Sequence, residues 1–182
     1  TFPDTRMRRT VLRTDRLLVI GAGPVGLAMA DALKQRDVAF DHVDASDGIG
    51  GLWRHGVYQG VHIVSSKKST GYTDYPMPAH YPDFPSHIQM LEYFQSYSRH
   101  FDVDRLIQFN TLVLHADKAS DGRWRVTIRK KNHHEVDTQV FDYLVVCNGH
   151  HWNPKLPSYK GSFSGDFLHS HFYSHAAPFK GK

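Results

Sequence analysis

A glycine-rich turn between a strand and a helix limits the fold of this chain more than any other feature. Residues 16–20 form a short, mostly apolar run that leads directly into the turn GAGPVG at 21–26. An alanine-rich stretch of strong helix propensity follows at 27–33. Strand, G-x-G-x-x-G turn and helix, in that order, indicate a dinucleotide-binding βαβ unit. We therefore expect an α/β, Rossmann-like domain built on a parallel sheet.

Each glycine of this turn has its own physical task. Gly21 permits the tight turn, Gly23 lets the backbone approach a pyrophosphate, and Gly26 lets helix and strand pack closely. Pro24 lies between them, at the expected start of the helix. A pyrophosphate would then lie against free backbone N–H groups at the positive end of the helix dipole.

The next segment favours FAD over other dinucleotides. A second strand is expected over 38–43, and Asp44 at its end would bind a ribose 2′-hydroxyl and repel the 2′-phosphate of NADP. The double glycine just beyond it resembles the second flavin-contacting motif of two-dinucleotide flavoproteins. A flexible loop is the simpler interpretation, but Trp53 is then hard to explain unless it packs on a flat group. The expected contacts of this segment are Gly50, Gly51, Leu52 and Trp53.

A proline-rich loop and a helix occupy the middle of the chain. Four prolines among aromatic residues between Asp74 and Pro85 predict a rigid, extended loop. Ser86 and Gln89 form a capping box that starts the helix. The apolar residues that recur at helical spacing after the box predict a core-facing helix, and they are Met90, Leu91, Phe94, Tyr97 and Phe101.

From Ile107 the apolar pattern changes to a period of two, which predicts strands. Asp121-Gly122 supplies a hairpin turn. We expect an antiparallel β-meander over about 107–142, inserted in the parallel sheet. The residues that carry the alternation are Trp124, Val126, Ile128, Val136, Thr138 and Val140. The apolar run 143–147 that follows is typical of a buried parallel strand.

Residues 163–173 resemble the identifying motif of the flavin-containing monooxygenases, F-x-G-x-x-x-H-x-x-x-Y. The matching residues are Phe163, Gly165, His169 and Tyr173. The D-x-P-M-P run at 74–78, preceded by a Ser-Lys pair, also resembles this family. The resemblance extends over the chain from Arg16 onward. It implies further cofactor contacts from Ser65, Ser66, Lys67, Asp74, Asn148 and Gly149.

In that family the motif lies between an FAD-binding and an NADPH-binding motif. The resemblance therefore implies a leader over 1–15, an FAD-binding domain over 16–162, and a linker over 163–182. The linker would lead toward an NADPH-binding domain outside this chain. NADPH would reduce FAD, and the reduced flavin would form a C4a-hydroperoxide with O₂. A nucleophilic nitrogen or sulfur of a small amine or sulfide would then take up the distal oxygen, with no catalytic side chain required.

Several alternatives stay open. Baeyer–Villiger monooxygenases share the architecture, but their motif ends in Trp, so Tyr173 favours nitrogen or sulfur oxygenation. Val64 occupies a place where the family carries asparagine beside the flavin, which leaves a flavoprotein oxidase or reductase possible. The single Cys147 argues against a disulfide reductase. The non-enzyme alternative is a truncated FAD-binding module, and we expect this chain alone to be inactive.

Composition narrows the classes of partner. The net charge of +4 comes largely from an N-terminal arginine cluster, which we interpret as a solvated leader rather than a nucleic-acid-binding arm. The cluster comprises Arg6, Arg8, Arg9, Arg13 and Arg16. No apolar run reaches the roughly 20 residues of a membrane span. The 14 histidines are not accompanied by a second anchoring pair such as C-x-x-C, so no metal is expected. With one cysteine and no secretory leader, we expect a cytoplasmic protein, with a homo-oligomer left open.

Overall fold

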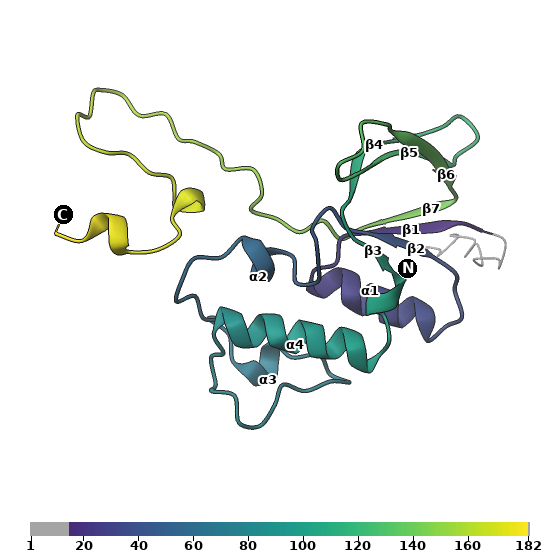
Figure 1. Cartoon of the computed structure of the whole chain (residues 1–182), viewed down its shortest axis with the longest axis horizontal. Helices are drawn as coiled ribbons and strands as arrows, with labels where there is room; N and C mark the ends of the chain where they lie inside the picture. Colours follow the sequence, from purple (N-terminus) through teal and green to yellow (C-terminus); the bar gives the residue numbers. More distant parts are fainter. Residues whose placement is uncertain (1–14, 182) are drawn as a thin grey trace, which may run out of the picture.

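The computed structural model describes residues 15–181, in which a parallel sheet lies between an antiparallel sheet and a layer of helices (Figure 1). The parallel sheet has the order β3-β2-β1-β7. Its strands are β1 (Leu17–Ile20), β2 (Asp41–Val43), β3 (Ile107–Gln108) and β7 (Tyr143–Val146). The antiparallel sheet joins β4 (Thr111–Lys118), β5 (Trp124–Lys130) and β6 (Asp137–Phe141). This confirms the expected α/β fold with an antiparallel β-insertion.

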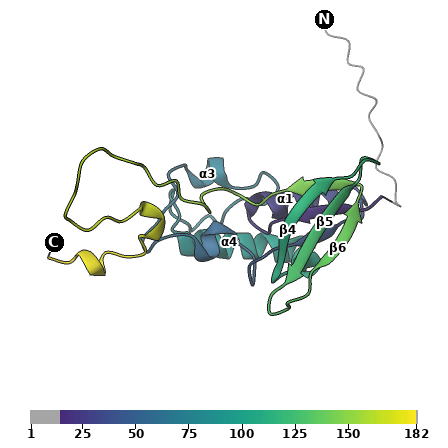
Figure 2. The ribbon, with the colours of Figure 1, turned by 90° about the horizontal axis from the view of Figure 1, so that it is seen from above.

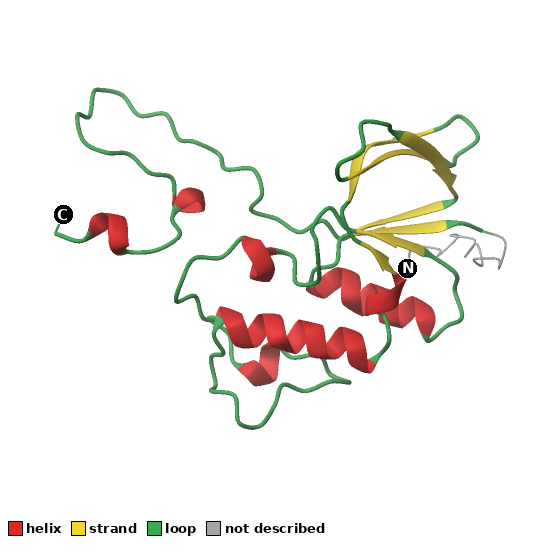
Figure 3. Ribbon diagram, in the orientation of Figure 1, coloured by secondary structure: helices red, strands yellow, loops and turns green. Residues whose placement is uncertain are grey.

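The two long helices lie on one face of the parallel sheet (Figure 3). They are α1 (Pro24–Lys34) and α4 (His87–His100). The shorter helical elements are α2 (Leu52–His55), α3 (Lys67–Thr70), η1 (Asp104–Leu106), η2 (Ser170–Phe172) and η3 (Ala177–Phe179). Within the described residues, none of these helices has the length and apolar character needed to cross a membrane.

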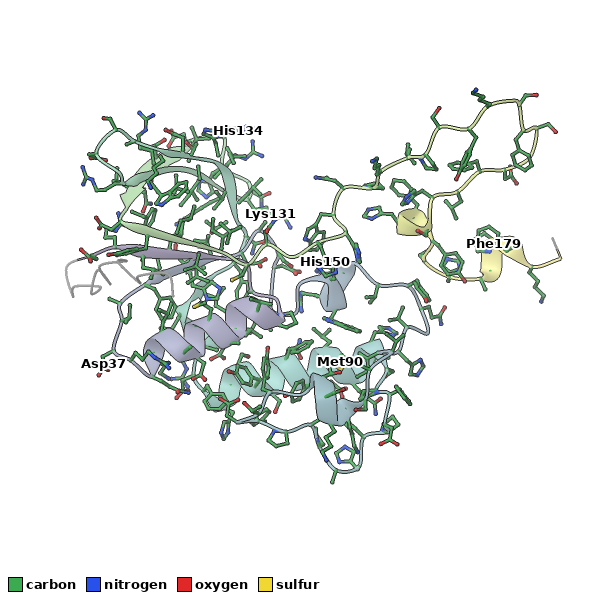
Figure 4. All side chains as sticks on the ribbon, turned by 180° about the vertical axis from the view of Figure 1, so that it is seen from behind. Asp37, Met90, Lys131, His134, His150 and Phe179 are labelled. Atoms are coloured by element: carbon green, nitrogen blue, oxygen red, sulfur yellow. The ribbon has the colours of Figure 1, made fainter. Side chains whose placement is uncertain are left out.

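The N-terminal end of α4 confirms the expected capping box. The Ser86 hydroxyl accepts from the Gln89 N–H, and the Ser86 N–H donates to the Gln89 side chain at 2.9 Å. Both bonds satisfy backbone or side-chain groups that the first turn of a helix leaves without intrahelical partners. Met90 lies one turn further, fully buried among the helices (Figure 4). The apolar face of α4 therefore packs inward, as its spacing predicts.

Each face of the parallel sheet has its own core. On the helical face, Leu27 and Ala30 of α1 pack with α4 and with Ile107. On the other face, Leu18 and Val43 pack against the antiparallel sheet. The parallel sheet is therefore covered by apolar packing on both faces.

Three strands differ from their expected positions. Residues 107–108 pair in parallel with β2, so the antiparallel sheet begins at Thr111 and not at 107. β2 covers only the last three of the six residues expected. β7 has one neighbour, β1, among the described strands, and its Val146 is 59% exposed rather than buried.

The orientation of β6 also differs from a simple apolar-inward pattern. Phe141 lies opposite Trp124, and Gln139 lies opposite Val126, so these side chains share the inward face. Val140 consequently lies on the outer face, 36% exposed. The expected apolar series at 136, 138 and 140 is therefore wrong for β6, whose inward residues are Gln139 and Phe141.

Arg16 explains why a glutamine faces inward. Its guanidinium donates to Asp41 of β2 at 2.8 Å and to Gln139 at 3.0 Å. It also donates to the Val140 carbonyl at 3.3 Å and lies 4.4 Å from the centre of the Phe141 ring. Because Asp41 belongs to the parallel sheet and the other three to β6, Arg16 joins the two sheets. The other arginines of the N-terminal cluster, and most of the expected leader, lie outside the described residues.

Beyond β7 the chain forms an extended arm over 151–181. In both views the arm runs away from the two sheets (Figures 1 and 2). It contacts the rest of the molecule near residues 58–59, where the Gln59 N–H donates to the Ser174 carbonyl at 2.8 Å. The edge of the Tyr58 ring also meets the Tyr173 ring, with 5.4 Å between centroids. The family motif therefore ends where the arm contacts the body.

We expect Arg16→Ala to lower the free energy of unfolding by roughly 1–2 kcal/mol, because it removes charged hydrogen bonds and a cation–π contact between two sheets. The half-exposed position of the side chain limits the effect. Urea denaturation followed by circular dichroism measures it.

Arg123→Ala is the matched control, since the Arg123 guanidinium hydrogen-bonds to Asp121 inside one hairpin turn. This control should leave the urea midpoint unchanged. Equal losses for the two variants would contradict a role for Arg16 in joining the sheets.

Candidate functional site

The glycine turn lies at the carboxyl edge of the parallel sheet, between the ends of three strands. The Gly21 N–H donates to the Val43 carbonyl at 2.8 Å, at the end of β2. On the other side, a Cβ added to Gly21 would overlap with the Cys147 carbonyl and lie 3.3 Å from the Asn148 nitrogen. Gly21 also has φ +107°, which side chains disfavour. Asn148, one of the expected cofactor contacts, thus lies directly beside the glycine turn at Gly21.

The double glycine packs directly on this turn. The Gly50 N–H donates to the Ala22 carbonyl at 3.1 Å. A Cβ on Gly51 would lie 3.1 Å from the Gly23 Cα, and both Gly50 and Gly51 have positive φ. Two segments that are separated in sequence therefore meet backbone to backbone and form one surface without side chains at these glycines.

Helix α1 begins on this surface. Its N-cap is Gly23, with Pro24 in the first turn and no side chain capping the N-terminus. The N–H groups of a first turn lack intrahelical acceptors and carry the positive end of the helix dipole. A Cβ on Gly26 would overlap with the Gly21 carbonyl, so a glycine here lets α1 start directly against the turn. The site therefore offers unshielded donors to an anionic group.

Asp44 is bonded to the glycine turn. One carboxylate oxygen accepts from the Ala22 N–H at 2.5 Å, and the other accepts from the Ser46 N–H at 2.6 Å. The Asp44 backbone also bridges the parallel sheet and β4, through Gln108 and Thr111. A carboxylate oxygen has two acceptor positions, so each oxygen of Asp44 keeps capacity for a ligand hydroxyl.

His42 is a residue of this site that the sequence patterns did not reveal. Its side chain is fully buried under the turn, and Nε2 lies 2.9 Å from the Gly21 carbonyl oxygen. Burial lowers the pKa of His42, although the Gly21 carbonyl and the Asp44 charge act in the opposite direction. The only hint in the sequence was a histidine inside a short strand that is otherwise mostly apolar.

The double-glycine loop is held from outside by ion pairs and from inside by an aromatic contact. Asp47 accepts from the Arg54 Nε at 2.7 Å, and this bond holds the Asp47 pKa well below its usual range. Trp53 packs against Phe94 of α4, with 6.4 Å between ring centroids, and Leu52 beside it is half-buried. Phe94 of the same chain therefore covers part of the Trp53 side chain.

The loop before the proline-rich segment is bonded mainly to itself. Ser66 caps α3, and the Lys67 ammonium donates to the carbonyls of Ala79 and Tyr81. The Ser65 hydroxyl pairs with Thr70 at 2.6 Å. These groups stabilise the loop, and within residues 15–181 none of these hydrogen bonds reaches the glycine turn.

Tyr72 joins this loop to the glycine turn. Its hydroxyl donates to the Pro24 carbonyl at 2.6 Å, and burial raises its pKa, so it stays protonated. Asp74, two residues on, is exposed. Tyr72 is a second residue that no motif pointed to.

A family model for flavin-binding monooxygenase-like proteins matches residues 14–182. The chain belongs to this family. It is 37% identical to flavin-containing monooxygenase 5 of Rattus norvegicus over 184 aligned residues, which cover 92% of this chain and 34% of the relative. It therefore spans about a third of that relative's length.

Two solved structures share the fold of this flavin monooxygenase family member. The S-allyl-L-cysteine S-oxygenase of Allium sativum superimposes with a TM-score of 0.84 at 26% identity, covering 91% of this chain and 44% of the other. OTEMO in complex with FAD and NADP gives a TM-score of 0.71 at 25% identity, covering 91% and 31%. Both likenesses extend over most of the chain.

The family motif itself lies on the arm and not at the glycine turn. His169 caps η2 by accepting from the His171 N–H at 3.1 Å, and a Cβ on Gly165 would overlap with the Phe163 ring. Tyr173 ends the motif at the contact with Tyr58. The motif residues of this family member are therefore arranged by local contacts, and Phe163 is 76% exposed.

The histidine pairs do not gather into a larger cluster in the described part of the chain. The His150 and His151 rings meet each other at 4.0 Å between centroids. Within residues 15–181, no three His, Cys, Asp or Glu side chains lie together as metal ligands would.

We expect Gly21→Ala to destabilise the protein by at least about 3 kcal/mol, because positive φ and overlap with the Cys147 carbonyl act together. Gly122→Ala is the matched control. Gly122 also has positive φ, but an added Cβ there meets nothing within 4 Å, so a cost of about 1 kcal/mol is expected. The urea midpoints of the two variants are compared. Equal midpoints would show that the backbone at Cys147 can move away from residue 21 at little cost.

Proposed function

We propose that this chain forms the FAD-binding part of an NADPH-dependent monooxygenase that oxygenates a nucleophilic nitrogen or sulfur of a small molecule. The observation that carries the proposal is the junction of two glycine turns at the start of α1, with Asp44 beside it. In this arrangement residues 16–162 build the FAD site, and residues 163–182 lead toward an NADPH-binding domain. The FAD and NADP complex of a structural relative supports the choice of cofactors.

The residues present fit an FAD molecule. The side-chain-free surface at Gly23 and Gly51 admits a pyrophosphate, whose charge the first-turn N–H groups of α1 would stabilise. Asp44 would accept from the adenosine ribose through its remaining acceptor positions. Asn148 and Gly149, past the end of β7, complete the edge of the site. These assignments depend on the absence of side chains at Gly21, Gly23, Gly50 and Gly51.

When bound, the flavin supplies the redox chemistry that activates O₂. The contribution of the chain is to bind and orient the cofactor. Tyr72 fixes the loop of residues 65–85 to the first turn of α1, so the loop and the phosphate end of the site move together. Lys67 stabilises the same loop through two carbonyl bonds, which limits its motion beside the cofactor.

Two observations support transfer of oxygen to nitrogen or sulfur. The motif ends in Tyr173 and not in Trp, and one solved relative at 26% identity is an S-oxygenase. The second candidate function is a flavoprotein oxidase. Val64 favours it, because this apolar side chain is 97% exposed and supplies no hydrogen bond where the family carries asparagine.

FAD binding is tested by absorbance of the purified protein and by titration of the FAD-free form with FAD. We expect one yellow flavin per chain, and Asp44→Ala should weaken binding at least tenfold, because it removes an ionised acceptor from both the ribose and the turn. Asp121→Ala, in the remote β4–β5 hairpin, is the control and should bind like the wild type. Absence of bound or bindable flavin would overturn the proposal.

Oxygen transfer is tested with a protein that carries this chain together with an NADPH-binding domain. It should consume one NADPH and one O₂ for each N-oxide or sulfoxide formed, whereas residues 1–182 alone should oxidise no NADPH. Peroxide as the sole product, whatever amine or sulfide is offered, would favour the oxidase. Conversion of a cyclic ketone to a lactone would favour Baeyer–Villiger chemistry.

A further inference from the structure

One peptide group of the glycine turn is held at both ends by side chains of the second strand. The Gly21 carbonyl lies 2.9 Å from His42 Nε2, and the N–H of the same peptide, on Ala22, donates to Asp44 at 2.5 Å. Between them, the Val43 carbonyl accepts from the Gly21 N–H at 2.8 Å. His42 of β2 and Asp44, the residue after β2, therefore fix the Gly21–Ala22 peptide, while Val43 holds the peptide before it.

This peptide needs such a restraint. Gly21 has no Cβ and φ +107°, so rotation of the peptide between Gly21 and Ala22 meets little steric resistance from the residue itself. A rotated peptide would turn the Gly21 carbonyl toward the pyrophosphate side and withdraw the Ala22 N–H from Asp44. A carbonyl dipole facing a phosphate is repulsive, so one orientation of the peptide suits an anionic ligand.

We propose that His42 is a positioning residue for FAD, which acts by donating from its neutral Nε2–H to the Gly21 carbonyl and so fixing the Gly21–Ala22 peptide for the pyrophosphate. The inference rests on the proposed function. It concerns a side chain that lies beneath the turn, on the helical face of the sheet, and that reaches the ligand only through the backbone.

The surroundings of the ring determine its tautomer. A carbonyl oxygen can only accept, so Nε2 must carry the hydrogen. Nδ1 is buried and has no partner in the described part of the structure. An added proton on Nδ1 would be a buried donor without an acceptor, which is costly. The ring is therefore held in the neutral form that has one donor, directed at Gly21.

The neighbours of the ring on other elements are not titratable. β1 and β3 present Val19 and Ile107 as the register partners of His42, and α1 presents Gly26, whose added Cβ would lie 3.5 Å from Nε2. The Phe40 ring lies 6.3 Å away between centroids. The charge that acts on the ring is Asp44, which favours the protonated form less than burial disfavours it.

Two substitutions separate the hydrogen bond from the packing. His42→Gln keeps an N–H donor near the position of Nε2, whereas His42→Leu keeps a buried side chain and removes the donor. We expect the leucine variant to bind FAD about tenfold more weakly, which corresponds to about 1.4 kcal/mol, and the glutamine variant to bind within about threefold of the wild type. Wild-type affinity for leucine in a folded protein would overturn the proposal, as would equal losses in both variants.

The pH profile of FAD affinity gives a readout that packing alone would not change. Because the pKa of His42 is lowered below its usual value of 6.5, the ring stays neutral at pH 6.5–8, and the ratio of wild-type to His42→Gln affinity should be constant there. A ratio that changes severalfold within pH 6.5–8 would show that the ring gains a proton there, and it would contradict the proposal.

The ring nitrogens can be observed without any cofactor. Nitrogen-15 NMR of the FAD-free protein should show His42 with a protonated Nε2 and an unprotonated Nδ1, and the opposite tautomer would overturn the proposal even if His42→Leu fails to fold. If the wild type shows the expected tautomer but binds no FAD, the proposed function fails while the hydrogen bond to Gly21 stands. The two failures are therefore distinguishable.

Discussion

Gly21 and Gly26 carry no side chains, and the meeting of β1, β7 and α1 depends on this. A methyl group at Gly21 would occupy the place of the Cys147 carbonyl, and one at Gly26 would occupy the place of the Gly21 carbonyl. The same absence of side chains that permits the packing also leaves backbone N–H groups uncovered at the start of α1. Stability and ligand access therefore share one cause, which is close contact between backbones.

The layers around the parallel sheet place this turn. Helices cover one face and an antiparallel sheet covers the other, so the carboxyl edge is where its backbone can reach a ligand. Arg16 ties the antiparallel sheet to β2, which supplies His42 to the turn and leads directly into Asp44. The antiparallel sheet thus stabilises β2, the strand next to the glycine turn, although this sheet and α1 lie on opposite faces of the parallel sheet.

Local patterns predicted the parts that depend on local physics. The glycine spacing, the capping box at Ser86 and the hairpin turn at Gly122 are set by neighbouring residues, and the structure has them as expected. The parallel pairing of residues 107–108 with β2 depends on contacts across the fold, which a period of two cannot distinguish from a hairpin. His42 was not predicted for the same reason, since its role follows from its contact with the Gly21 carbonyl and not from its spacing in the sequence.

The pairing of β1 with β7 has a consequence for the order of folding during synthesis. Arg16, at the entrance to β1, bonds to Asp142 across 126 residues of sequence. At translation rates of about 5–20 residues per second, β1 waits roughly 6–25 s for that neighbour to be made. Until then β1 has β2 beside it and an open hydrogen-bonding edge on its other side. The nascent chain thus carries an unpaired strand, the kind of edge that promotes association with other chains.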